Sequence, residues 1–341
     1  MKTIIRLVII LFILTCAASA GGYFYLKSLF QPVALEPFYH NVKIAPGSSV
    51  AEIGRALNEK GVIKSQFAFW FYVKMNGFDS KLKAGDYAFS ADWNIEQIVK
   101  KLIAGETQNI TLTVPEGFSL EELRLRLKKY NIMDENQFNT AANDPELLKS
   151  LPYQLDTIEG VLFPETYIFN KSAKPGEILK MMVKEFKNKL PKDTDEQLKK
   201  LGRPFREVLI MASLVEKEAR HDEDRAKIAS VFYNRLAKQM KLESCATVQY
   251  ILGENRKSKL LYSDLQVDSP FNTYKNKGLP PAPICSPSKK SIMAALNPET
   301  TDYLFFVAKP DGYHIFSKNF ADHTRGKQTS KKLGGEKNGD N

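Results

Sequence analysis

The alternation of apolar and polar residues predicts helices joined by short strands along most of this 341-residue chain. The clearest helical pattern lies at 206–220, REVLIMASLVEKEAR, which follows Pro204 and is rich in strong helix formers. Three residues precede Glu216 by seven, four and three positions on the same helix face: Leu209, Ala212 and Ser213. The pattern therefore places the Glu216 carboxyl group on an apolar stripe.

Strand and helix patterns alternate in the region 41–106. They predict a short strand before a turn at Pro46-Gly47, helices at 49–60 and 65–76, a strand at 85–89 and a helix at 94–104. Ser49 is the expected N-cap of the first helix. Part of the pattern recurs at 117–127, which favours a second strand-turn-helix unit, although a common helix-start pattern explains the recurrence nearly as well.

The second half of the chain predicts loops, helices and one hairpin. The segment 159–169, EGVLFPETYIF, is typical of a buried loop or edge strand, and 171–200 indicates a solvated, lysine-rich helical connector. A helix is expected from Asp222 to Lys238, and YLFFVAKPDGYHIF predicts a hairpin turned at Pro310-Asp311-Gly312. From Gly326 the chain is rich in Lys, Gly and Asn, so this tail is expected to be disordered. Together these elements predict an α+β fold.

An apolar run from Leu7 to Leu26 follows Lys2 and Arg6. Its length matches a hydrocarbon core of about 30 Å at about 1.5 Å per helical residue. Positive charge on the short N-terminal side predicts that this side is cytoplasmic and that the chain after Lys27 is extracytoplasmic. The alternative is a cleaved signal peptide, because Ala18-Ser19-Ala20 is an acceptable cleavage site.

Composition narrows the class of partner. With 43% hydrophobic and 26% charged residues, the chain is typical of a globular protein. Its net charge of +10 suits nucleic acid, anionic lipid or an acidic polymer equally well. Because either interpretation of the N-terminus exports the bulk of the chain, we expect no nucleic-acid partner.

Glu216 is the strongest candidate for chemistry. Apolar neighbours such as Met211 and Val215 would favour the protonated carboxyl group by desolvation. A glutamic acid kept protonated in this way is what a glycosidase-type general acid requires. The alternative is a glutamate at a helix boundary that pairs with Lys217 or a nearby arginine.

Several motifs in fixed order resemble the endolytic murein transglycosylases of the YceG-like family. They are EGVLFPETY, MASLVEKEA, RAKIASVFYNRL, ATVQY, SPFNTY, GLPPAPI and YLFFVAKPDGYHIF. Together with the region before them, these motifs extend the resemblance over about residues 40–325. The N-terminal apolar run agrees with it. It implies a transmembrane anchor, a small LysM-like α/β module and a mixed α+β catalytic domain.

The predicted organisation has seven segments. They are a cytoplasmic N-terminus at 1–6, an anchor at 7–26, a tether at 27–40, the LysM-like module at 41–106, a second strand-helix unit and connector at 107–200, the catalytic domain at 201–325 with a contribution from 155–170, and a disordered tail at 326–341.

The resemblance implies cleavage of the β-1,4 bond between N-acetylmuramic acid and N-acetylglucosamine inside peptidoglycan strands, leaving a 1,6-anhydromuramic end. The catalytic glutamate of the family matches Glu216. Its activity in the family implies that new glycan strands are terminated near peptidoglycan synthases, the penicillin-binding proteins. We expect a single-pass protein of the plasma (inner) membrane.

One carboxyl group is sufficient for this reaction, because it can act first as acid and then as base. Candidate substrate-binding residues are Asn272, Thr273 and Tyr274 in one loop, Thr247 and Gln249 on the opposite wall, and Tyr167, which either stacks on a sugar or belongs to the core. Glu218 is expected to meet Arg225 or Arg235. The four histidines have no metal-site spacing, so we expect no metal and no cofactor.

The chain departs from the family pattern at Cys245 and Cys285, near the ATVQY and GLPPAPI motifs. Two cysteines beside the expected cleft in an oxidising compartment predict a disulfide. The alternative is two buried thiols.

Two other functions remain open from the sequence. A muramidase that uses water would need a second carboxylate, for which Asp264 and Asp268 are candidates. A non-catalytic scaffold that binds the cell wall would need no carboxylate at all.

Overall fold

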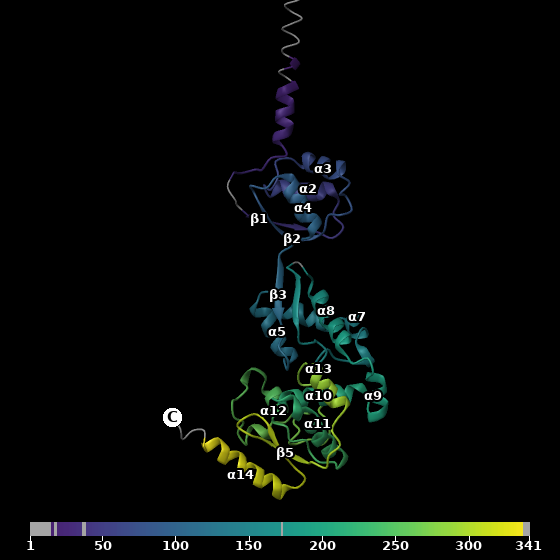
Figure 1. Ribbon diagram of the computed structural model, residues 1–341, viewed down its shortest axis with the longest axis vertical. Coiled ribbons are helices and arrows are strands. Elements are labelled where there is room, and N and C mark those ends of the chain that lie inside the picture. Colours follow the sequence, from purple (N-terminus) through teal and green to yellow (C-terminus); the bar gives the residue numbers. More distant parts are fainter. Residues whose placement is uncertain (1–14, 17–18, 36–38, 172, 337–341) are drawn as a thin grey trace, which may run out of the picture. The chain divides into compact units, whose positions relative to one another are not determined.

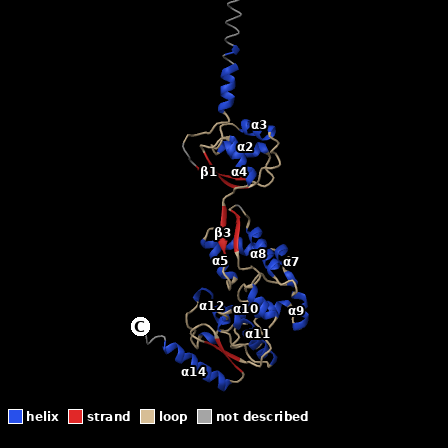
Figure 2. Cartoon of the chain, viewed as in Figure 1, coloured by secondary structure: helices blue, strands red, loops and turns tan. Residues whose placement is uncertain are grey.

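The computed structural model describes residues 15–16, 19–35, 39–171 and 173–336 and has an α+β fold with small two-stranded sheets (Figures 1 and 2). Two compact units make up this part of the chain. Unit 1 comprises the described residues up to Thr111 together with Ile168–Ala173. Unit 2 comprises Leu112–Tyr167 and the described residues from Lys174 onward.

Unit 1 has the order strand, helix, helix, strand, helix. Its elements are β1 (Tyr39–Ile44), α2 (Val50–Glu59), α3 (Gln66–Met75), β2 (Gly85–Ser90) and α4 (Ile95–Ala104). β1 and β2 pair antiparallel, from Tyr39 opposite Ser90 to Ile44 opposite Gly85. The Ser49 side chain caps α2, as expected, and Glu52 completes a capping box. The core includes the fully buried Leu57, Phe69 and Phe89.

The helices and strands predicted for 49–104 are confirmed to within a residue or so at each end. Residues 19–28 are helical. Among the described residues, none of the helices has the length and apolar character needed to cross a bilayer. Much of the anchor predicted at Leu7–Leu26 lies outside the described residues.

The first part of unit 2 is mostly helical. Its elements are α5 (Leu120–Lys129), α6 (Glu135–Ala142), α7 (Pro145–Lys149), α8 (Pro175–Lys189) and α9 (Thr194–Leu201). β3 (Asn109–Thr113) pairs with β4 (Thr166–Asn170), and both strands cross from one unit to the other. α8 buries Leu179, Met182 and Phe186, so the predicted solvated connector also supplies core residues. The apolar residues of α8 recur at helical spacing, so they form one face of the helix that packs into the core.

The second part of unit 2 is built around α10 (Phe205–Glu218). The elements around it are α11 (Asp222–Ala237), α12 (Cys245–Leu252) and α13 (Lys289–Leu296). α10 packs against α11, α12 and α13, so all residues from Val208 to Val215 are buried and not only one stripe. β5 (Phe305–Ala308) and β6 (His314–Ser317) form the predicted antiparallel hairpin.

The prediction of a disordered tail from Gly326 is wrong for the described residues, because α14 (Phe320–Glu336) continues through them. α14 packs on both strands of the hairpin. A Cβ atom at Gly326 would lie 3.3 Å from Ile315 and 3.4 Å from Val307, so this glycine permits close contact. The Ser330 hydroxyl donates to the Ala308 carbonyl at 2.7 Å. These tertiary contacts outweigh a composition that is typical of disorder.

Candidate active site

Glu216 lies in the last turn of α10, where the helix meets the segment that leads into α13. Ser213 joins the two, because its hydroxyl accepts a hydrogen bond from the Ile284 amide at 3.1 Å. The Cys285 thiol donates to the Ser213 carbonyl at 3.4 Å. These contacts bring Ser288, the N-cap of α13, to the Glu216 side chain.

The Glu216 carboxylate is enclosed, with 7% of its side chain exposed. Its Oε2 atom accepts from the Ser288 hydroxyl at 2.6 Å, from the Ser288 amide at 3.0 Å and from Arg225 Nη1 at 3.2 Å. Within the described part of the chain, every hydrogen bond of this carboxylate goes to Oε2. Oε1 is therefore the oxygen left to act on a ligand.

These polar partners differ from the apolar surroundings expected for Glu216. Arg225 is itself buried and also donates to Ser291 Oγ at 2.5 Å and to Asp222 Oδ1 at 3.1 Å. The pairing with an arginine, which was the alternative interpretation, is thus present beside the apolar helix. Helix periodicity did not reveal it because Arg225 and Ser288 belong to other elements.

The loop that contains Gly117 also lies against Glu216. Gly117 has φ +74°, a conformation that favours glycine, and a Cβ atom there would lie 3.7 Å from Glu216 Cγ. Its carbonyl accepts from Lys217 Nζ at 2.8 Å, and its amide donates to the Ser286 carbonyl at 3.0 Å. The loop is therefore fixed beside the carboxylate.

Glu116, next to this glycine, was missed by the sequence analysis. Partial burial, and then the negative charge of Glu216, raise the pKa of Glu116. A second carboxyl group thus lies within electrostatic range of Glu216. In the sequence, only the turn Pro115-Glu116-Gly117 before a predicted helix marked the position of Glu116.

Glu218 is buried and does not pair with either predicted arginine. Its Oε1 accepts from the Ser244 hydroxyl at 2.6 Å, and burial raises the pKa of Glu218. Arg225 is engaged by Glu216, and Arg235 binds Glu243 at 3.1 Å. The expected partner was wrong because helix geometry gives only the direction of a side chain.

The loop residues predicted to bind sugar are held by other parts of unit 2. Asn272 Nδ2 donates to the carbonyls of Leu265 and Val267 at 2.9 and 2.8 Å, and Asn272 Oδ1 accepts from the Tyr274 amide. Thr273 Oγ1 accepts from the Ser244 amide at 3.0 Å, which links this loop to Glu218. Their polar groups shape the loop.

The other candidate substrate-binding residues also have internal partners. Thr247 and Thr273 share a hydrogen bond of 3.0 Å between their hydroxyls. Gln249 binds both the amide and the carbonyl of Lys257. Tyr167 is buried, and its hydroxyl donates to the Phe163 carbonyl, which agrees with the core alternative.

The structure corrects the predicted disulfide, since Cys245 and Cys285 are both free thiols. Cys285 is fully buried against Ser213, as described above. Cys245 is exposed at the start of α12, and its Sγ lies 3.0 Å from the Tyr274 hydroxyl. The two cysteines therefore face different surroundings.

The second carboxylates considered for a muramidase lie in ion pairs of their own loop. Asp264 binds Lys257 at 2.6 Å, and Asp268 binds Lys275 at 3.0 Å. Among the described residues, no cluster of three His, Cys, Asp or Glu side chains is arranged to hold a metal ion.

Comparison with known proteins gives consistent matches over most of the chain. Residues 42–329 match the model of the YceG-like family. An endolytic murein transglycosylase of Bacillus subtilis (strain 168) is 38% identical over 325 residues, which cover 90% of this chain and 89% of that protein. An endolytic murein transglycosylase of Streptococcus pneumoniae serotype 2 is 35% identical over 90% of this chain, which spans 62% of that protein.

A solved structure supports the same assignment. The crystal structure of a YceG-like protein from Listeria monocytogenes has 38% sequence identity and a TM-score of 0.57, and the match covers 84% of this chain and 98% of that one. With the family model matched over nearly all of the described chain, these findings establish that the chain belongs to the YceG-like family.

Proposed function

We propose that this protein is a lytic transglycosylase that cleaves peptidoglycan strands internally between N-acetylmuramic acid and N-acetylglucosamine. The observation that carries the proposal is the enclosed Glu216 carboxyl group, held through Oε2 alone. The relatives named endolytic murein transglycosylase support the substrate and the reaction.

In the first step Glu216 acts as general acid. When the carboxyl group carries a proton, three donors directed at Oε2 leave Oε1 as the oxygen that bears it. Oε1 gives this proton to the glycosidic oxygen as its bond to the muramic C1 atom breaks, so the N-acetylglucosamine side leaves as an alcohol. Arg225 and Ser288 stabilise the carboxylate that forms.

In the second step the substrate supplies the nucleophile. The O6 hydroxyl of the muramic residue bonds to C1, and Glu216 removes the hydroxyl proton. The product is the 1,6-anhydro end, and Glu216 returns to its protonated state. The Glu116 carboxyl group lies within electrostatic range of Glu216, and its ionised form would stabilise the positive charge that develops at C1.

The test is digestion of purified glycan strands by the wild type and by Glu216→Gln, with the new ends identified by mass spectrometry. We expect anhydro ends from the wild type and no cleavage by the variant. Glu207→Gln is a matched control, because Glu207 lies on the same helix and pairs with Arg203 at 2.7 Å at the surface. Reducing ends would instead support a muramidase, for which Glu116 is a candidate second carboxylate because the charge of Glu216 affects its pKa. Unchanged cleavage by Glu216→Gln would refute the proposal.

We further propose that the protein is anchored in the plasma (inner) membrane by the apolar run at 7–26, with unit 1 close to the lipid surface. Aromatic side chains support this placement. Tyr23 and Phe24 at the end of the run are exposed, and Phe67 and Phe71 on α3 line the same apolar groove as Tyr23. Trp and Tyr are enriched at membrane interfaces, and Phe is common on the apolar face of helices that lie in the interface.

Fluorescence of Trp70, which stacks on Phe67 at 5.9 Å between ring centroids, reports on this placement. In full-length protein reconstituted into vesicles and carrying Trp93→Phe, brominated lipids should quench Trp70. Emission that is insensitive to brominated lipid would contradict membrane contact of α3.

The strand, helix, helix, strand order of β1, α2, α3 and β2 supports a LysM-like module in unit 1. We propose that it holds the glycan while unit 2 terminates strand elongation near the peptidoglycan synthases. Cells that carry Glu216→Gln should then have longer glycan strands by chromatographic length analysis. An unchanged length distribution would argue against this role.

A further inference from the structure

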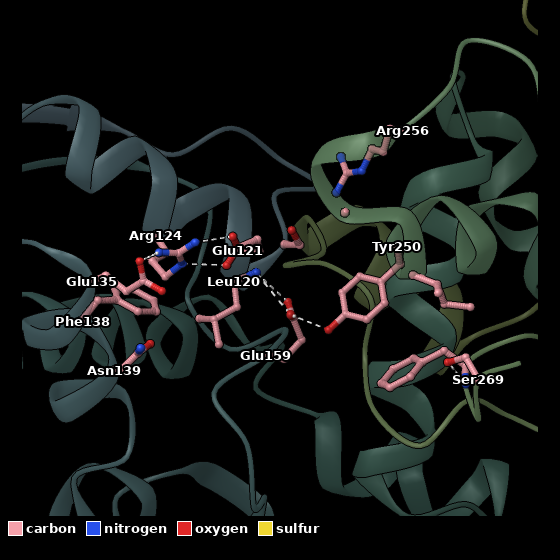
Figure 3. A pocket seen from close by; sticks show the side chains of 14 residues that line it. Leu120, Glu121, Arg124, Glu135, Phe138, Asn139, Glu159, Tyr250, Arg256 and Ser269 are labelled. Carbon is pink, nitrogen blue, oxygen red and sulfur yellow. Dashed lines mark hydrogen bonds and ion pairs between the residues drawn. The ribbon is translucent and has the colours of Figure 1, made fainter. Parts of the chain in front are cut away.

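Unit 2 contains a second candidate site, a pocket of about 550 Å³ between α5, α6 and the region around α12 (Figure 3). Glu159 and Tyr250 meet in it, and their side chains point toward each other (Figure 3). The Tyr250 hydroxyl donates to Glu159 Oε2 at 3.1 Å, and the Leu120 amide donates to Glu159 Oε1 at 3.0 Å. None of the roles assigned above uses Glu159.

The ring of Phe271 lies beside Tyr250, with 5.0 Å between ring centroids. Both rings line the pocket, as does the Phe138 ring from α6. Aromatic surface with a few converging polar groups is typical of sites that bind small molecules and sugars. Burial raises the pKa of Glu159 to about 7, so this carboxyl group can donate as well as accept a hydrogen bond near neutral pH.

Both arginines that line the pocket are paired with carboxylates. Arg124 binds Glu121 at 2.5 Å and Glu135 at 2.8 Å. Arg256 binds Glu122 at 2.5 Å. Two arginines thus face three carboxylates, and this excess of negative charge disfavours an anionic ligand, while pairing leaves no arginine open for it, so the lining favours a neutral ligand that is rich in hydrogen-bonding groups.

Two chain segments connect the pocket to the catalytic glutamate. Gly117 lies against Glu216, and Leu120, three residues later, lines the pocket, so their Cα atoms are at most about 11 Å apart. On the other side, Gly160 has φ +85° and packs on Pro283, close to the segment that leads to Ser288. A strand bound at Glu216 can therefore reach the pocket within a few sugar units.

We propose that the pocket is a subsite for a neutral N-acetylated sugar unit of the strand that Glu216 cleaves, with Tyr250 and Phe271 as the ring platform and Glu159 as the hydrogen-bonding partner. This inference rests on the proposed function. Peptide stems of the same polymer carry carboxylate groups, which the negatively charged lining does not favour.

The first test uses kinetics of the full-length protein on peptide-free glycan strands. Tyr250→Ala removes the platform and should raise KM about tenfold with little change in kcat. Asn139→Trp places a bulky ring on the exposed rim without removing core contacts and should raise KM similarly. Tyr262→Ala is the control, because Tyr262 is 80% exposed outside the pocket. If both pocket variants keep the wild-type KM, the inference is wrong.

The second test does not depend on cleavage. Tetra-N-acetylchitotetraose that carries a photoreactive diazirine should crosslink Glu216→Gln protein at peptides containing Tyr250 or Asn139, and Asn139→Trp should abolish these crosslinks. Crosslinks in the pocket, together with no cleavage of glycan by the wild type, would refute the proposed function but support a sugar-binding site in the pocket. Crosslinks elsewhere only, or competition by a free stem peptide but not by unlabelled chitotetraose, would overturn the subsite.

Discussion

Ser288→Ala isolates the contribution of one hydrogen bond to the proposed acid. The substitution removes the hydroxyl that binds Glu216 Oε2 at 2.6 Å but keeps the backbone amide bond at 3.0 Å. A hydrogen bond to a charged group contributes about 1.5–3 kcal/mol. Because this bond strengthens as the carboxylate forms, its loss should lower kcat by about 10- to 150-fold. KM should stay nearly constant, since Ser288 is buried and its hydroxyl binds Glu216.

The same hydroxyl also caps α13, where it accepts from the Ser291 amide at 3.3 Å. Loss of the cap should cost about 1 kcal/mol of stability, measured by urea unfolding. Ser49→Ala removes a comparable cap from α2 and should destabilise unit 1 without changing kcat. Ser288→Thr keeps a hydroxyl and should recover most of the rate. If Ser288→Ala loses stability while its kcat stays within twofold of the wild type, Ser288 is only a cap and our reasoning about Oε2 fails.

Two further results are expected. The pKa of Glu159 is raised to about 7 from 4.5, so its protonated form contributes about 3 kcal/mol of stability below about pH 4.5, and this contribution is lost as the pH rises to about 7. Urea unfolding of the wild type should show this loss of stability relative to Glu159→Gln. Parallel curves of stability against pH for the two proteins would contradict it. Maleimide should label Cys245 in the native protein but label Cys285 only after unfolding, because Cys285 is fully buried and burial raises the pKa of its thiol. A peptide pair linked through Cys245 and Cys285 in mass mapping without reductant would contradict free thiols.

Local patterns predicted most of the elements correctly. Ser49, Ser65 and Pro310 lie at two predicted helix starts and a predicted hairpin turn, which depend on nearby residues, and the structure has those elements close to the expected positions. The α14 helix was missed because its stability comes from contacts with a hairpin, which composition does not report.

The candidate site was predicted only in part. The sequence pattern singled out Glu216, yet its partners Arg225 and Ser288 come from two other elements, and Ser288 is far along the chain. Side-chain direction on a helix does not predict such partners. The disulfide was predicted from two cysteines beside the expected cleft in an oxidising compartment. Bond formation depends on three-dimensional geometry, and one thiol is buried beside Ser213 while the other is exposed.

The contact between Gly326 and the hairpin has a practical consequence for shortened forms of the protein. A two-stranded sheet is only marginally stable by itself, and α14 covers β5 and β6. Ending the chain before Gly326 would remove this cover and leave Val307 and Ile315 to the solvent. The lysine-rich end, which looks dispensable on composition alone, should therefore be retained when the protein is shortened for crystallisation. Otherwise a loss of activity caused by the truncation would be mistaken for a property of the active site.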